Sequence, residues 1–333
     1  AVLEFENTGL SILEISHRSK EFIAVMEEAR ALSLELLGLT GKGYQALFLQ
    51  GGASLEFLMV PYNLMKVGGK AAYLDTGAWS GKALKEAKGV GETLVVASSK
   101  DKNYNYIPKN YAIPADVDYL HITSNNTIFG TQVKDFPKTD VSLVSDMSSD
   151  IFSRQLDFSQ FDLIYAGAQK NMGPAGTTLV VVKEDILGKS GRNIPAMLDY
   201  QIHIANESMY NTPAVYAVYV SLLNLRWLKN LGGIAAIEKI NEHKAQLLYN
   251  EIDRNPLFTG TCEVEDRSPM NVCFLLKDDA HKETFDKLWK AANISGINGH
   301  RSVGGYRASM YNALAVESVQ ALVDCMKELE NKI

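Results

Sequence analysis

The chain has 333 residues, of which 46% are hydrophobic and 22% charged, and its formal net charge is −6. This length exceeds what one core usually covers, so we expect two domains. The acidic balance argues against a general nucleic-acid binder, and no apolar run reaches the roughly 18 residues of a membrane span. No secretory leader is apparent, and the three cysteines show no CxxC spacing, which favours a cytoplasmic protein.

Short apolar runs alternate with helical patterns over the first two-thirds of the chain. Residues 19–39 repeat apolar side chains at helical spacing, and further helices are expected at 51–65 and 78–91. Strands are expected at 44–50, 70–75, 92–98, 119–123, 141–146, 162–168 and 177–182. This alternation predicts an α/β fold with a mostly parallel, seven-stranded-type sheet sandwiched by helices.

The pattern changes towards the C-terminus. Two long helices are expected at 211–233 and 233–255, followed by short strands and helices. The strands are expected at 271–277 and 306–312, and the helices at 281–293 and 316–332. We therefore expect a large α/β domain at 1–235 and a smaller α+β domain at 236–333.

Lys170 stands where the expected strand 162–168 gives way to a glycine-rich turn, in the sequence DLIYAGAQKNMGPAG. Ligands of parallel sheets bind at the carboxyl ends of the strands. A partly desolvated amine there loses its proton more easily and can condense with an aldehyde. Lys170 is therefore a candidate Schiff-base lysine, and the alternative is an ordinary solvated lysine.

Asp146 ends a neighbouring expected strand, in the sequence VSLVSDMSS. A carboxylate at this edge would suit the ring nitrogen of pyridoxal phosphate (PLP), because it keeps that nitrogen protonated. Alternatively, Asp146 could cap a helix that starts near Ser148.

Other strand ends carry candidate cofactor contacts. The sequence QGGAS at 50–54 would place the N–H groups of Ala53 and Ser54 at a helix start that favours an anion; a simple strand-to-helix turn is the alternative. Trp79 could stack on a flat ring or belong to the core, and Thr127 could bind a ring hydroxyl or phosphate. No Walker loop, HExxH, GxSxG or His/Cys cluster appears, so no metal is expected.

Taken together, these stretches resemble the class V, fold type I PLP-dependent aminotransferases over nearly the whole chain. The resemblance rests on EISHRSKEF (14–22), GGAS (51–54), TGAWS (76–80), HITSNNTIFG (121–130), SDMSSDIFSR (145–154), YAGAQKNMGPAG (165–176), NTP (211–213) and GHRSVGGYRASMYNA (299–313). Family members normally begin with a Phe-x-Ala-Gly-Pro segment, which the printed sequence does not contain.

The resemblance implies a role for each candidate. Lys170 would bond to PLP, Asp146 would pair with the ring nitrogen, and Trp79 would stack on the ring. Four further residues would bind the cofactor: Ala53, Ser54, Thr127 and Gln169. Asn211 and Thr212 would reach the cofactor phosphate of the other subunit, which implies a homodimer.

Basic residues gather in the first and last of these motifs. Arginine binds carboxylate or phosphate in bidentate fashion. Within the family, the motifs imply transfer of the amino group of L-glutamate to 3-phosphohydroxypyruvate, giving O-phospho-L-serine and 2-oxoglutarate in serine biosynthesis. The phosphorylated four-carbon keto acid of pyridoxine biosynthesis is a further candidate substrate. Arg18 and Arg307 would bind carboxylates, and His17, His300 and Arg301 would lie near the phosphate. Read alone, the motifs could also be a helix N-cap and an exposed basic hairpin.

Three other functions remain open at this point. A small-substrate aminotransferase of class V would not need His300 and Arg301. A cysteine desulfurase needs a nucleophilic cysteine on a mobile loop, whereas Cys262, Cys273 and Cys325 sit in or beside apolar segments. A catalytically silent PLP-fold binding protein is the third alternative, and the presence of both Lys170 and Asp146 argues against it.

Overall fold

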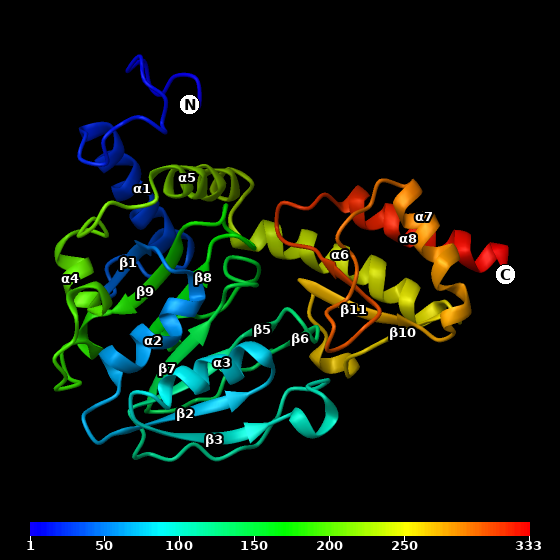
Figure 1. Ribbon diagram of the computed structural model, residues 1–333, viewed down its shortest axis with the longest axis horizontal. Helices are drawn as coiled ribbons and strands as arrows, with labels where there is room; N and C mark the ends of the chain where they lie inside the picture. The colour runs from blue at the N-terminus through cyan, green and yellow to red at the C-terminus, as the bar shows by residue number, and fades with distance from the viewer.

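The computed structural model describes residues 1–333 and shows a larger α/β part and a smaller α+β part connected through a long helix (Figure 1). The larger part contains α1 (Lys20–Leu36), β1 (Tyr44–Leu49), α2 (Gly52–Leu64), β2 (Lys70–Asp75), α3 (Ala78–Ala87), β3 (Glu92–Ser98), β4 (Tyr119–Thr123), β5 (Asn125–Asn126), β6 (Thr131–Gln132), β7 (Ser142–Asp146), β8 (Leu163–Gly167), β9 (Thr178–Lys183), α4 (Tyr200–Ala205) and α5 (Val215–Asn230). None of the helices is both long and apolar enough to cross a membrane.

The seven-stranded sheet has the order β1-β9-β8-β7-β4-β2-β3. β9 pairs antiparallel with both β1 and β8, and the other pairs are parallel. The expected mostly parallel α/β sheet is confirmed. All seven expected strands are present, with ends that differ by at most one residue.

Helices cover both faces of this sheet. One core cluster joins the sheet to apolar side chains of α1 and α5, including Phe22, Met26 and Leu222. The other cluster joins the opposite face to α2 and α3, including Phe57 and Ala83. With both faces buried, the strands read as continuous apolar runs, as parallel sheets require.

The smaller part is built on a three-stranded antiparallel sheet with the order β10-β11-β12. Its elements are α6 (Ile234–Arg254), β10 (Phe258–Gly260), β11 (Asn271–Leu276), α7 (Lys282–Ala291), β12 (Tyr306–Ser309) and α8 (Val316–Lys332). The sequence patterns did not predict β10. They also extended β12 to residue 312, whereas the strand ends at Ser309 and the chain continues as a loop.

α6 contributes to the cores of both parts. Ile234 and Ile237, in its first turn, belong to the cluster beneath α1 and α5. Leu248 and Ile252, further along, belong to the core of the smaller part. The domain boundary that we expect between residues 235 and 236 falls in this first turn, so the helix itself is the connector (Figure 1).

Candidate active site

Three neighbouring strands bring their carboxyl ends together at one edge of the large sheet. In the register, Thr123 at the end of β4 pairs with Asp146 at the end of β7. Asp146 in turn pairs with Tyr165 of β8, two residues before that strand ends. The segments that follow β4 and β8 carry Thr127 and Lys170, so this edge collects three of the expected site residues: Asp146, Thr127 and Lys170.

Lys170 is held over this edge by a hydroxyl and faces an aromatic ring. Its Nζ donates a hydrogen bond of 3.0 Å to Thr127 Oγ1 and lies 5.4 Å from the centroid of the Trp79 ring. Burial lowers the pKa of Lys170, the charge of Arg307 lowers it further, and Asp146 opposes both effects. A lowered pKa increases the fraction of free amine, which is the nucleophilic and basic form.

Asp146 is a buried carboxylate, with 5% of its surface exposed. Burial raises its pKa, and the nearby Lys170 charge and the hydrogen bonds from Ser148 act against that rise. Its Oδ1 accepts a 2.9 Å hydrogen bond from the Ser148 backbone N–H, but this bond lies within a turn and caps no helix. The residues after Ser148 form turns rather than a helix, which leaves the carboxylate available at the sheet edge.

The start of α2 offers uncapped backbone N–H groups beside this edge. Gly51 is the N-cap, with φ of 101°, and no side chain caps the helix. A Cβ at Gly51 would lie 2.5 Å from Leu55 Cδ2, so this turn requires glycine. Ala53 and Ser54 occupy the first turn, where the helix dipole favours an anion.

Trp79 follows β2, and Gln169 follows β8. Trp79 opens α3 and is partly buried, and its indole Nε1 is buried without a hydrogen-bond partner. The Gln169 side chain is exposed next to Lys170 and lies against Gly167, where an added Cβ would be 2.8 Å from its Oε1.

Arg307 is the basic residue that the structure brings close to Lys170. It lies on β12 opposite Cys273, is half-buried, and its guanidinium forms no hydrogen bond or ion pair with the chain. Its Nε is buried without a partner. An arginine without a counter-ion beside a reactive amine is suited to an anionic ligand.

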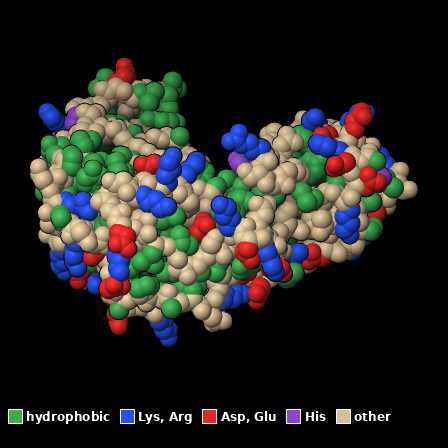
Figure 2. Space-filling model, turned by 60° about the horizontal axis from the view of Figure 1, so that its bottom comes forward, with side chains coloured by type: hydrophobic (Ala, Val, Ile, Leu, Met, Phe, Trp, Pro, Cys, Tyr) green, Lys and Arg blue, Asp and Glu red, His purple; other side chains and the backbone are tan.

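The other basic candidates lie in two loops, one in each part of the molecule. His300 and Arg301 lie in the loop before β12, where His300 Nδ1 accepts a 3.2 Å hydrogen bond from the Ser302 N–H. His17 and Arg18 precede α1 in the larger part, and no hydrogen bond or ion pair joins their side chains to Lys170. Figure 2 shows a deep notch between the two parts of the molecule, with Lys or Arg side chains and a histidine at its edge.

Asn211 and Thr212 lie beside the start of α2 rather than beside Lys170. Asn211 Nδ2 donates to Gln50 Oε1 at 3.2 Å, and Gln50 Nε2 donates to the Thr212 carbonyl at 3.1 Å. Neither residue contacts Lys170 by a hydrogen bond within one chain.

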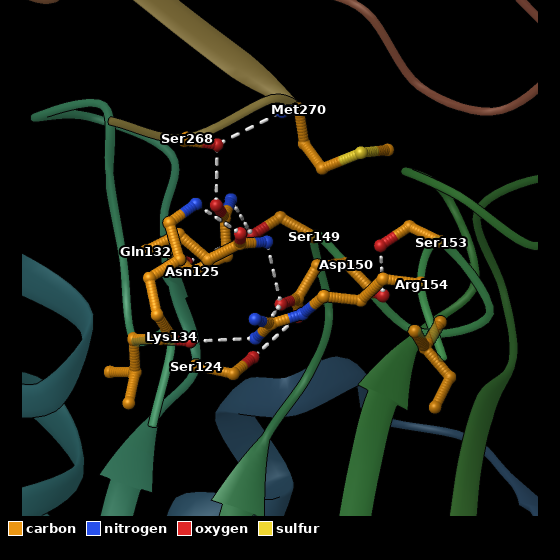
Figure 3. Close-up of polar contacts among 12 residues, drawn as sticks. Ser124, Asn125, Gln132, Lys134, Ser149, Asp150, Ser153, Arg154, Ser268 and Met270 are labelled. Carbon is orange, nitrogen blue, oxygen red and sulfur yellow. Dashed lines mark hydrogen bonds and ion pairs between the residues drawn. The ribbon is translucent and has the colours of Figure 1, made fainter. Parts of the chain in front are cut away.

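Sequence reasoning missed a buried polar network behind the sheet edge (Figure 3). Asp150 accepts hydrogen bonds from Ser124, from Gln132 at 3.2 Å and from Arg154 at 3.3 Å. Asn125 extends this network to the smaller part, because it accepts a 2.5 Å hydrogen bond from Ser268 Oγ. The motifs HITSNNTIFG and SDMSSDIFSR contain most of these residues, but their polar character alone indicates only a loop.

Comparison with known proteins identifies the family. The profile described as aminotransferase class-V matches residues 4–322. The phosphoserine aminotransferase of Flavobacterium psychrophilum is 74% identical over 333 residues, which cover 100% of this chain and 94% of that protein. The phosphoserine aminotransferase of Parabacteroides distasonis is 58% identical, with 100% and 93% covered.

The chain belongs to the class-V aminotransferase family. The structure agrees with that membership. A structure reported as the PLP-bound phosphoserine aminotransferase of Trichomonas vaginalis is 34% identical, with a TM-score of 0.92 over 98% of this chain and 93% of that chain. A phosphoserine aminotransferase structure that describes radiation damage of its Schiff base is 46% identical, with a TM-score of 0.96 over 100% and 93%.

The PLP that class-V aminotransferases use fits the residues present at this edge. Trp79 presents an aromatic ring whose centroid is 5.4 Å from Lys170 Nζ, which suits a flat cofactor ring bonded to that amine. The uncapped start of α2 suits a phosphate, and the buried carboxylate of Asp146 suits a protonated ring nitrogen.

Proposed function

We propose that this chain, with PLP bound, transfers the amino group of L-glutamate to 3-phosphohydroxypyruvate and releases O-phospho-L-serine and 2-oxoglutarate. The names of the 74% and 73% identical relatives support this substrate pair. The structural observation that carries the proposal is the position of Arg307, a half-buried arginine without a counter-ion next to Lys170.

Lys170 acts as nucleophile and base in this proposal. PLP, when bound, supplies an electron sink that stabilises the negative charge left at the substrate Cα. Lys170 Nζ would bond to the cofactor at rest and remove the Cα proton once the substrate has displaced it. Its lowered pKa, caused mainly by burial, suits both tasks. Asp146, Trp79 and Thr127 would hold the ring.

Substrate recognition rests on cations at two ends of a short molecule. We assign the carboxylates to Arg307 and Arg18, and the phosphate or the second carboxylate to the region of His17, His300 and Arg301. Glutamate and the phosphorylated keto acid each carry anionic groups at both ends, so one set of cations can serve both half-reactions.

The thiols argue against a cysteine desulfurase. Burial raises the pKa of Cys262 to about 11 and that of Cys273 to about 12. The pKa of Cys325 is raised as well, again chiefly by burial. A nucleophilic cysteine needs a lowered pKa and exposure, and none of the three meets this requirement. Free thiols also suit the cytoplasmic location that we propose.

We further propose that the enzyme is a homodimer in which Asn211 and Thr212 complete the partner's phosphate site. In support, both lie near the surface beside the exposed apolar side chains of Met197, Tyr210 and Tyr216. A set of exposed apolar residues next to a polar ligand contact is typical of a subunit interface. Sedimentation of the purified protein tests this point, and a monomer at micromolar concentration would contradict it.

The decisive experiment follows the cofactor absorbance of the purified protein. Addition of glutamate alone should bleach the band of the lysine-bound cofactor, and 3-phosphohydroxypyruvate should then restore it with release of O-phosphoserine. Pyruvate and glyoxylate in the second step test for a small-substrate aminotransferase, and the phosphorylated four-carbon keto acid tests for the pyridoxine pathway. A band that does not respond to glutamate would indicate the silent binding protein instead.

A further inference from the structure

The turn after β7 presents three consecutive backbone carbonyls to three asparagine side chains. Asn171 Nδ2 donates to the carbonyl of residue 151 at 2.5 Å, and Asn312 Nδ2 donates to that of residue 152 at 3.0 Å. Asn241 Nδ2 donates to the carbonyl of residue 153 at 3.1 Å. We call these three residues the asparagine cluster.

The asparagine cluster is also bonded internally. Asn241 Nδ2 donates to Asn312 Oδ1, and the backbone N–H of Asn312 donates to Asn171 Oδ1, each at 2.8 Å. The exposed fractions of Asn171, Asn241 and Asn312 are 4%, 1% and 4%. Because water does not compete at these positions, each bond fixes the relative placement of two segments.

The three asparagines come from three different segments of the chain. Asn171 directly follows Lys170 in the larger part, Asn241 lies on α6, and Asn312 lies in the loop that follows β12 and Arg307. The asparagine cluster therefore joins the segment that carries the reactive amine to the segment that carries the unpaired arginine.

Lys244, one helical turn after Asn241, also binds the loop that follows β12. Its side chain is fully buried, and its Nζ donates to the carbonyls of Met310, Tyr311 and Leu314 at 3.1, 2.9 and 3.2 Å. An ammonium group has three donors, and all three are used. No carboxylate forms an ion pair with it, and burial lowers the pKa of Lys244 to about 8. Burial of an ammonium group is costly, which indicates that the position of this loop matters.

The turn itself is held in an unfavourable conformation. Phe152, in its centre, is 1% exposed and has φ of 59°, a left-handed value that a bulky side chain rarely adopts. Such backbone persists only where the surroundings determine it, and here the hydrogen bonds of the asparagine cluster do so.

We propose that Asn241, Asn312 and Lys244 are positioning residues, which hold Arg307 at the distance from Lys170 that a bound amino or keto acid requires. The proposal rests on the proposed function, because it assigns Arg307 to the substrate carboxylate. When Arg307 binds that carboxylate, the substrate Cα must lie within reach of Lys170 Nζ, and a displacement of about 1 Å can cost on the order of 100-fold in rate.

The test compares Asn241→Ala with Asn255→Ala in the cofactor-loaded enzyme. Asn255 ends the same helix, is 1% exposed, and donates to Glu251 and to the Met326 carbonyl at 2.9 and 3.2 Å, but it lies within the smaller part. We expect Asn241→Ala to lower kcat/KM for glutamate and for the keto acid at least about 10-fold. The absorbance band and its rate of reaction with hydroxylamine, which has no carboxylate, should stay within about twofold. Asn255→Ala should lower the melting temperature without the kinetic loss.

A double-mutant cycle separates positioning from general destabilisation. If Asn241 acts through Arg307, Asn241→Ala should cost little in an Arg307→Lys background. The proposal is overturned if the kcat/KM losses of Asn241→Ala and Arg307→Lys are additive in the double variant. It is also overturned if the kcat/KM of Asn241→Ala stays within twofold of the wild type, or if Asn255→Ala loses as much kcat/KM as Asn241→Ala. Asn241→Ser, which retains one donor, replaces Asn241→Ala if the latter does not fold.

Hydrogen exchange provides a measurement that does not depend on turnover. Faster amide exchange over residues 306–314 in Asn241→Ala than in Asn255→Ala supports the proposal, and equal exchange overturns it. If the wild-type enzyme does not transaminate the proposed pair, the proposed function fails, and exchange alone then decides whether the asparagine cluster fixes the Arg307 segment.

Discussion

Lys170 Nζ donates its hydrogen bond to Thr127 Oγ1 across 3.0 Å, so the segment after β4 orients an amine that the segment after β8 supplies. The bond joins two strand ends and points the amine towards the Trp79 ring, whose centroid is 5.4 Å away. Neither residue alone defines a site, and their contact brings two distant motifs of the sequence to one place.

Replacement of Lys170 by alanine should abolish turnover and the absorbance band of the lysine-bound cofactor. The reason is that no other amine lies beside the Thr127 hydroxyl. Lys85→Ala, on the exposed face of α3, is the matched control and should behave as the wild type. Near-native transamination by Lys170→Ala would show that the assignment is wrong.

Asp146→Asn should lower kcat on the order of 100- to 1,000-fold while the cofactor remains bound. Asparagine keeps the size of the side chain and can still accept from the Ser148 N–H, but it carries no charge to keep a ring nitrogen protonated. Single-turnover absorbance measurements with glutamate check this expectation. An unchanged rate of the first half-reaction would remove Asp146 from the mechanism.

Arg307→Lys should weaken the binding of both glutamate and the keto acid by about 10- to 100-fold, because a bidentate charged contact is replaced by a point charge. The cofactor band should be unaffected in the absence of substrate. Arg254→Lys is a control in the same part of the molecule, since Arg254 already pairs with Glu251 and Glu330. Equal Michaelis constants in Arg307→Lys and the wild type would contradict the assignment.

Glu56 should make the stability of the protein depend on pH. The carboxyl group is fully buried, bonds to the Tyr200 hydroxyl at 2.5 Å, and burial raises its pKa to about 8. In the unfolded chain the Glu56 carboxyl group has its ordinary pKa of about 4.3. Between these values the folded state binds more protons, so the contribution of Glu56 to the free energy of unfolding decreases as the pH rises from about 5 to 8.

Glu56→Gln tests this dependence, since it replaces the carboxyl by a neutral group of the same shape. The variant should melt at a higher temperature than the wild type at pH 8 and at nearly the same temperature at pH 5. Thermal unfolding followed by circular dichroism at both pH values measures the difference. A gain that is equal at both values would mean that Glu56 does not titrate in this range.

The sequence predicted the large sheet and its edge well, since buried parallel strands read as apolar runs that end at polar residues. The positions of Asp146 and Lys170 at this edge were predicted in this way. The direction of β9 could not be found, because its run TTLVVV has the same character whether the strand is parallel or antiparallel. α5 begins at Val215 rather than near Asn211, and the residues before it are used for contacts with Gln50.

The polar contacts between the two parts could not be predicted. Asn125, Asn241 and Asn312 are each of a residue type that is common in turns and on surfaces, and nothing local indicates that all three are buried. Their partners lie far away in the sequence, as in the bond that Asn241 donates to the carbonyl of residue 153. Only the folded chain shows that these side chains satisfy one another.

The helix α6 supplies apolar side chains to two separate cores, with Ile234 and Ile237 in one and Leu248 and Ile252 in the other. Removal of this helix from either part of the molecule would therefore expose apolar side chains to water. A fragment that ends on either side of α6 would have an incomplete hydrophobic core. We therefore expect the larger and the smaller part to fold and unfold together.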